Sequence, residues 1–271
     1  MSTFLLIGGT GKVGSRLAES LRLQGAEVRI ASRTGGDVRF DWRDPDTYAA
    51  AVAGVTGIFV VGPGSASDWS HLLTELLRVA EAAGVERVAL LSARGVEFLK
   101  DGAVAKAEKA LVAGPLDWTI LRPSHFSQNF TEAMFVPVDG VIVAPVGDGA
   151  EPFVDVLDIA DVAARVLASG SYPNQVIELS GPAALTFDEA ASILEAKIGR
   201  PVKYRDELSE AHVDSLRAAG TPEGYITWRM AMLGGIRDGK DAYISDGVQR
   251  ILGRPATSFA DWAAREAGSL R

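Results

Sequence analysis

Four glycines fall within seven residues directly after the first apolar run, in the segment Gly8-Gly9-Thr10-Gly11-Lys12-Val13-Gly14. They fit a GxxGxxG spacing and, counted from Gly9, a GxGxxG spacing. Glycines at this spacing make a tight turn after a strand and let the backbone approach a pyrophosphate, and the next helix then directs its N-terminus at the phosphates. The pattern predicts a dinucleotide site, with contacts in this loop from Gly8, Thr10, Gly11, Lys12, Val13 and Gly14. A GxxxxGK[ST] phosphate loop is excluded because that spacing does not occur.

The residues after the second predicted strand indicate which dinucleotide is bound. An NAD site usually has Asp or Glu at this place, where the carboxylate accepts hydrogen bonds from the ribose. This chain has Ser32 and Arg33 there and no acid. A guanidinium group suits a 2′-phosphate because its planar donors bind phosphate oxygens in pairs. The sequence therefore predicts NADP(H) rather than NAD(H), with an ordinary solvated arginine as the alternative at position 33.

Two further places are expected to contact the cofactor. Asp41 can accept a hydrogen bond from the adenine amine, and Trp42 can flank the ring; the alternative is a plain loop before a helix that begins at Asp44-Pro45. Gly62 and Pro63 follow the third predicted strand, where small residues leave room for the cofactor backbone.

Strand and helix patterns alternate from residue 3 to about residue 180. Apolar strands are predicted at residues 3–7, 26–31, 57–61, 87–91 and 117–121, with helices between them. Such runs predict an α/β fold with a Rossmann-like, doubly wound parallel sheet, and ligands in these sheets bind at the carboxyl ends of the strands. We predict an NAD(P)-binding domain over residues 1–180.

The remaining chain, residues 181–271, has a different pattern. A helix is predicted from Thr186 to Gly199, a short strand over residues 200–204, and further helices with breaks at 220–222 and 234–235. We predict a smaller, mostly helical lobe that covers the substrate.

Composition narrows the possible functions. The net charge of −8 argues against general nucleic-acid binding, and a 47% hydrophobic content is enough for a core without disulfides. There are no cysteines, which fits a reducing cytoplasm, and the three histidines are far apart in sequence, so no metal site is expected. The N-terminal apolar run lacks a basic flank and breaks at Gly8, which predicts neither a secretory signal nor a membrane span.

Several segments together resemble the NmrA-like branch of the atypical short-chain dehydrogenases/reductases, a group with quinone-oxidoreductase-like and ergot-alkaloid-pathway members. The resemblance spans nearly the whole chain and rests on the glycine loop, Leu90-Leu91-Ser92-Ala93, Ala107-Glu108-Lys109-Ala110-Leu111, Trp118-Thr119-Ile120-Leu121-Arg122-Pro123, Pro145-Val146-Gly147-Asp148-Gly149 and Phe153-Val154-Asp155-Val156-Leu157-Asp158-Ile159-Ala160. It implies a Rossmann-like sheet, NAD(P) binding and a substrate site between the sheet and the C-terminal lobe.

The chain departs from the wider short-chain family at its usual acid–base pair, YxxxK. Gly102 stands four residues before Lys106, where the family has tyrosine, and no tyrosine occurs between Tyr48 and Tyr172. The standard proton donor is therefore absent.

Three other residues are candidates for catalysis. Ser92 follows the fourth strand and can orient a carbonyl oxygen or bond to the ribose; the alternative is that it only closes the strand end. Lys106 can contact the ribose or donate a proton, or it can lie on a solvated helix face. His125 titrates near neutrality and can act as a general acid, or it can be a loop histidine bonded to backbone. Pro123 is expected to shape the nicotinamide pocket, and Asp158 to cap a helix.

These observations favour an NADPH-dependent oxidoreductase that passes hydride to a small apolar carbonyl, quinone or activated alkene. The alternative is an NADP(H)-binding redox sensor without turnover. The expected partner is a small-molecule substrate, without nucleic acid or membrane, in the cytoplasm; homodimer formation is left open.

Overall fold

The computed structural model describes residues 2–64, 67–266 and 268–269. The chain forms two compact units, each built from segments that are separated in sequence. Unit 1 consists of Met1–Ala93, Lys100–Arg122 and Ile159–Ile177, and unit 2 of Arg94–Leu99, Pro123–Asp158 and Glu178–Arg271.

A seven-stranded sheet forms the centre of unit 1. Its strands are β1 (Thr3–Ile7), β2 (Glu27–Ser32), β3 (Val38–Arg39), β4 (Gly57–Val60), β5 (Arg87–Leu91), β6 (Asp117–Pro123) and β9 (Gln175–Leu179). They lie in the order β3-β2-β1-β4-β5-β6-β9, and the pairs β1–β2, β2–β3, β1–β4, β4–β5 and β5–β6 are parallel. The order reverses beside β1, which is the doubly wound topology. The predicted α/β fold is confirmed.

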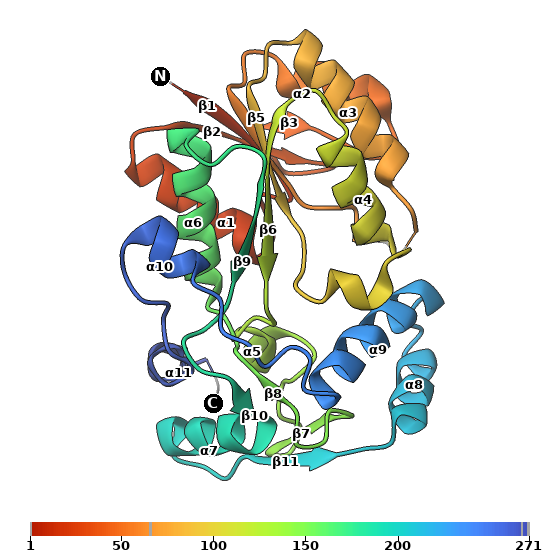
Figure 1. Ribbon diagram of the computed structural model, residues 1–271, viewed down its shortest axis with the longest axis vertical. Helices are drawn as coiled ribbons and strands as arrows, with labels where there is room; N and C mark the ends of the chain where they lie inside the picture. Colours follow the sequence, from red (N-terminus) through yellow and green to blue (C-terminus); the bar gives the residue numbers. More distant parts are fainter. Residues whose placement is uncertain (1, 65–66, 267, 270–271) are drawn as a thin grey trace. The chain divides into compact units, whose positions relative to one another are not determined.

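Helices cover both faces of this sheet (Figure 1). On one face are α1 (Lys12–Leu23) and α6 (Val156–Ser169), which are joined by a 3.1 Å hydrogen bond from Ser20 to Asp161. On the other are α2 (Tyr48–Val52), α3 (Ser70–Ala82) and α4 (Ala103–Val112), whose apolar side chains share a core with alternate residues of the strands. Side chains that point to opposite faces of β1, such as Leu5 and Leu6, are both fully buried, which explains the continuous apolar runs in the sequence.

Unit 2 contains two short sheets beside its helices. Strand β7 (Val141–Ala144) pairs in parallel with β11 (Lys203–Asp206), and β8 (Ala150–Glu151) pairs antiparallel with β10 (Leu185–Thr186). The helices are α5 (Asn129–Glu132), α7 (Phe187–Ile198), α8 (Ser209–Ala218), α9 (Glu223–Arg237), α10 (Gly247–Leu252) and α11 (Phe259–Glu266). The described residues also form two 3₁₀ turns, η1 (Pro45–Thr47) in unit 1 and η2 (Val96–Leu99) in unit 2.

These pairings join residues 141–151 to residues 185–206, so the compact units cut across the predicted boundary at residue 180. Phe130, Phe135, Phe153 and Phe187 form one aromatic core, in which ring centroids lie 4.8 to 6.3 Å apart. Local patterns in residues 123–158 do not show this pairing, because each strand involved is only two to four residues long.

Three local predictions for residues 156–271 are wrong. The strand near residue 200 begins only at Lys203, after Pro201. Helix α9 continues through Gly234 and Gly235 instead of breaking there: a Cβ on Gly235 would lie 2.1 Å from the Phe98 ring, so the glycine permits close packing. Asp158 does not cap α6; the carboxylate of Asp155 accepts the Leu157 amide at 3.1 Å and serves as the cap.

The predicted helix start at Thr186 is correct. Thr186 and Glu189 form a complete capping box, and Gly199 ends the helix in the left-handed conformation. None of the helices in the described parts of the chain combines the length and the apolar run that a bilayer crossing requires.

Candidate active site

The glycine loop has the geometry that a pyrophosphate cradle needs. Gly8 has a φ of +84°, and a Cβ on Gly14 would lie 2.2 Å from the Gly8 carbonyl oxygen. The loop closes through a 3.0 Å hydrogen bond from the Gly11 amide to the same oxygen. Gly11 is the N-cap of α1, and no side chain in the described chain caps this helix end. The amides of the first turn are therefore disposed to bind an anion, which fits a dinucleotide.

The end of β2 leaves no carboxylate for a ribose. Arg33 is exposed, and the Ser32 hydroxyl donates to the Thr34 carbonyl oxygen at 2.7 Å. An acid does lie nearby, Asp37, but its carboxylate accepts the Ile30 amide at 2.8 Å. The Asp37 carboxylate thereby takes the place of a backbone carbonyl on a neighbouring strand, because β3 pairs only with Ala31 and Ser32 of β2. Arg33 and Asp37 are both exposed in this turn, and Arg33 is its cation.

The two other regions expected at the cofactor also have structural roles. Trp42 is 8% exposed, with its ring 5.2 Å from both Phe40 and Trp69 in the core, so little of its surface is left to meet a nucleotide. Asp41 accepts the Arg43 amide at 3.0 Å. A Cβ on Gly62 would lie 2.7 Å from the Trp69 ring, so the space left by this glycine is filled by that ring. Pro63 is exposed. Cofactor contacts at these four residues remain predictions.

Ser92 belongs to a buried network in unit 1. Its hydroxyl donates to the carboxylate of Glu108, which is 7% exposed and lies on α4. Arg122 donates to both oxygens of the same carboxylate, at 2.9 and 2.5 Å. The serine proton is therefore directed at Glu108. The Ser92 oxygen can still accept a hydrogen bond, so contact with a ribose hydroxyl is compatible with this geometry.

Lys106 lies on α4, and Gly102 is the N-cap of that helix. The position that holds tyrosine in the wider family is therefore occupied by a cap without a side chain. The Lys106 ammonium forms a 3.2 Å ion pair with Asp68, and both side chains are about two-fifths exposed (43% and 42%). The hydrogen bonds from Ser70 lead the causes that lower the pKa of Asp68 to about 2, and Lys106 contributes.

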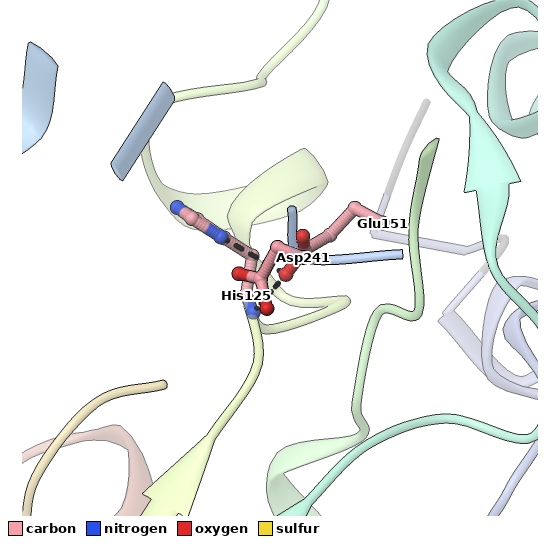
Figure 2. Close-up of side chains that lie close together, drawn as sticks. All are labelled: His125, Glu151 and Asp241. Atoms are coloured by element: carbon pink, nitrogen blue, oxygen red, sulfur yellow. Dashed lines mark hydrogen bonds and ion pairs between the residues drawn. The ribbon is translucent and has the colours of Figure 1, made fainter. Parts of the chain in front are cut away.

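His125 lies two residues beyond the end of β6, in unit 2, where Glu151 and Asp241 surround it (Figure 2). Its Nδ1 is 3.1 Å from Oε1 of Glu151, and its backbone amide donates to the same oxygen at 2.8 Å. Glu151 is fully buried and Asp241 is 2% exposed. Arg94, also buried, lies 2.9 Å from Asp241 and stacks on the Tyr243 ring at 3.4 Å from its centroid.

This cluster shifts two pKa values upward. Burial opposes the charge on His125, but the carboxylates of Glu151 and Asp241 outweigh it and raise the pKa of the imidazole above 6.5, while Arg229 on α9 acts the other way. Burial and then repulsion from Glu151 raise the pKa of Asp241 to about 7. Arg94 and His125 limit that rise.

We expect the protein to lose stability as the pH rises from 5 to 8. Between the unfolded and folded pKa values, the folded chain holds protons on Asp241 and His125 that the unfolded chain has released, so the slope of stability against pH is negative. The stabilising effect of the lowered pKa of Asp206 is complete above about pH 4.5, because that group is then ionised in both states.

Thermal unfolding followed by circular dichroism at pH 5, 6, 7 and 8 measures this slope. Asp241→Asn should flatten it, whereas Asp238→Asn, at a side chain that is 55% exposed, should leave it unchanged. A melting temperature that rises across this range in the native chain would contradict the expectation.

Comparison with known proteins places the chain in a family. The family model described as NAD(P)H-binding matches residues 8–169, more than half of the chain. This chain belongs to the NAD(P)H-binding family. An uncharacterized oxidoreductase, YesF of Bacillus subtilis, is 34% identical over 97% of this chain and 94% of its own length. An NAD(P)H azoreductase of Xenophilus azovorans is 29% identical over 98% of both chains.

Solved structures share the fold. The NADPH complex of the quinone oxidoreductase QOR2 from Escherichia coli has a TM-score of 0.81 at 22% identity, covering 97% of this chain and 99% of that one. NmrA, a negative transcriptional regulator in complex with NAD, has a TM-score of 0.78 at 15% identity, covering 97% and 94%. The predicted membership of an NAD(P)H-binding family is confirmed, the likeness to NmrA is one of fold, and the chain is an NAD(P)H-dependent oxidoreductase.

Three buried carboxylates of these clusters are not among the residues that the sequence analysis singles out: Glu108, Glu151 and Asp241. Two of them carried a usable signal. Glu108 follows Ala107 on a helix face that is otherwise apolar, and Glu151 stands directly before Pro152-Phe153-Val154. A charged residue inside an apolar pattern is buried only when it is paired, so such positions indicate partners elsewhere in the fold.

Proposed function

We propose that the chain transfers hydride from NADPH to a small apolar carbonyl, quinone or activated-alkene substrate. The observation that carries the choice of cofactor is the end of β2, where Arg33 is exposed and the one nearby acid, Asp37, is bonded to the backbone. The relatives named as an NAD(P)H azoreductase and an NADPH-dependent quinone oxidoreductase support the reductase part.

The substrate class follows from the missing tyrosine. When bound, NADPH supplies the hydride. A quinone that accepts it becomes a stabilised phenolate, and an enone becomes an enolate, so both need less help from an acid than a simple ketone does. A site with Gly102 in place of the family tyrosine suits such acceptors.

Each protein group has an expected role toward the cofactor. The loop from Gly8 to Gly14 holds the pyrophosphate on backbone amides, Arg33 and Ser32 bind the 2′-phosphate, and Lys106 and Ser92 bind the nicotinamide ribose. The remaining proposed contacts are Asp41 and Trp42 at the adenine, and Gly62, Pro63 and Pro123 along the cofactor.

Arg33→Ala should weaken NADPH binding by about 10- to 100-fold and leave NADH binding within about twofold. The lost interaction is a charge-assisted hydrogen bond worth about 1.5–3 kcal/mol. Calorimetric titration of the native chain and the variant with both cofactors measures this. Arg22→Ala removes an exposed arginine at the far end of α1 and serves as the matched control.

Turnover is then tested with NADPH and a panel of quinones, enones and azo compounds. Oxidation of NADPH above the background rate supports the reductase. Tight NADPH binding without turnover on any acceptor would instead favour the redox sensor, and equal affinity for NADH and NADPH would overturn the assignment of Arg33.

A further inference from the structure

The imidazole of His125 is held in one orientation by a buried carboxylate. Oε1 of Glu151 accepts the His125 backbone amide at 2.8 Å and lies 3.1 Å from Nδ1. Figure 2 shows the ring with Nδ1 toward Glu151 and its other nitrogen pointing away from the cluster. Because Oε1 is an acceptor, the proton of the neutral ring belongs on Nδ1. The atom left to exchange a proton is Nε2, and the side chain retains 11% exposure.

The surroundings of Glu151 hold a second carboxyl group and one fixed cation. Ligand atoms of His125, Glu151 and Asp241 all lie within 4.8 Å of one another. Two carboxylates this close in a buried site repel each other, so the pair is most stable with one bound proton. Arg94 balances the remaining charge from the side of Asp241.

These donors are of types that a divalent metal also binds, but the charges favour a proton. Arg94 is completely buried and its Nε lies 2.9 Å from the Asp241 carboxylate, so a dication bound there would face a fixed positive charge in a low dielectric. A proton shared by the two carboxyl groups brings only one positive charge near Arg94 and neutralises one carboxylate.

A buried nitrogen of the cluster lacks a partner, which points to a site that another group completes. Nη1 of Arg94 is buried and makes no hydrogen bond in the described parts of the chain. Buried polar atoms of this kind are rare in native structures and are associated with bound water or with catalysis.

Ser92 and Lys106, the other two candidate acids, are less suited to donate a proton to a substrate. The Ser92 hydroxyl donates to Glu108, and the Lys106 ammonium is paired with Asp68 on a well-exposed face. His125 alone among the three combines a fixed tautomer with partners that stabilise its protonated form.

We propose that His125, Glu151 and Asp241 form the proton-delivery site of the reductase, in which Nε2 of His125 protonates the oxygen of the reduced substrate. Glu151 and Asp241 are positioning residues. This inference rests on the proposed function. As hydride reaches the carbonyl carbon of a ketone, or the β-carbon of an enone, the carbonyl π electrons end on oxygen, and NADPH becomes NADP⁺. The Nε2–H bond then breaks, its electrons stay on nitrogen, and an O–H bond forms on the substrate. Neutral His125 keeps its Nδ1 proton beside Glu151 and regains the other from water.

The first test reads His125 directly by NMR of the full chain labelled with ¹⁵N-histidine. The chain has three histidines, and His71 and His212 serve as internal references, since His212 has its own glutamate partner in Glu207. We expect neutral His125 to carry its proton on Nδ1. Glu151→Gln should lower the pKa of His125 by about one unit or more, and Asp241→Asn by less, with both references unmoved. A neutral ring protonated on Nε2 would overturn the proposal without any variant.

The second test measures kcat and its pH dependence in variants of the cluster. His125→Gln should lower kcat for a simple enone about 100-fold while NADPH affinity stays unchanged, and the loss should be smaller for a benzoquinone. Glu151→Gln should move the alkaline limb of the kcat profile to lower pH, a shift that a purely structural role would not produce. His71→Gln, at an exposed position, is the matched control.

The outcomes separate the two proposals. Full turnover by His125→Gln with an unchanged pH profile would overturn the proton-delivery site and leave the reductase standing. A native chain that binds NADPH but reduces no acceptor would overturn the reductase itself.

Discussion

Asp155→Ala should lower the free energy of unfolding by about 2–4 kcal/mol, one of the two largest losses that we expect from a single substitution. Asp155 is fully buried and joins three parts of unit 2. Its Oδ1 accepts the Leu157 amide at 3.1 Å and the Gln128 amide group at 2.8 Å, and its Oδ2 accepts from Arg265 at 2.7 Å. Alanine removes a helix cap, which is worth about 1 kcal/mol. It also leaves the buried Gln128 amide group without an acceptor, which costs about 1–3 kcal/mol more.

Two variants separate these contributions. Asp155→Asn keeps one acceptor oxygen for α6 or Gln128 but loses the charge opposite Arg265, so its loss should be smaller. The Arg265 side chain is 39% exposed and can turn to water, which limits the contribution of the ion pair. Asp214→Ala, at a side chain that is 80% exposed, should have almost no effect. Urea unfolding curves of the four chains give the comparison, and an alanine variant as stable as the asparagine one would contradict this account.

The features predicted well from sequence are those whose causes are local. The glycine turn, the capping box at Thr186 and the strands of the sheet each depend on residues within a few positions of one another. Neighbouring residues fix the conformation there, so reading the pattern was enough. Gly102 before Lys106 likewise showed directly that the family tyrosine is missing.

The features that were missed depend on contacts between distant segments. The partners of His125 come from a two-residue strand and from a loop after α9, and neither has a periodic pattern. The sequence predicts a helix break at Gly235 because Phe98, whose ring packs against this glycine, lies far away in sequence. Asp155 and Asp158 stand three residues apart, and only the position of the helix start determines which one caps it.

Gly14→Ala should destabilise unit 1 by more than about 3 kcal/mol or prevent its folding. The added Cβ would lie 2.2 Å from the Gly8 carbonyl oxygen and 2.6 Å from the Gly9 Cα, and both are backbone atoms of a turn that the β1–α1 connection fixes. A flexible side chain could move aside, but here α1 itself must shift away from the sheet. Overpacking that backbone cannot relieve exceeds the usual 1–3 kcal/mol of core overpacking.

Substitutions in the same loop and helix show whether the close approach is the cause. Ser15→Ala lies on the exposed side of α1 and should change the melting temperature little. A Cβ on Gly11 would lie 3.3 Å from the same Gly8 oxygen, so Gly11→Ala should fold with a modest loss. It should also weaken NADPH binding, because the methyl group would enter the space that we propose for the pyrophosphate. Circular dichroism melts and NADPH titrations of the three variants are the measurement. If Gly14→Ala folds with native stability and binds NADPH normally, α1 does not pack on the turn as closely as the structure shows. Close packing would then not explain why position 14 is glycine.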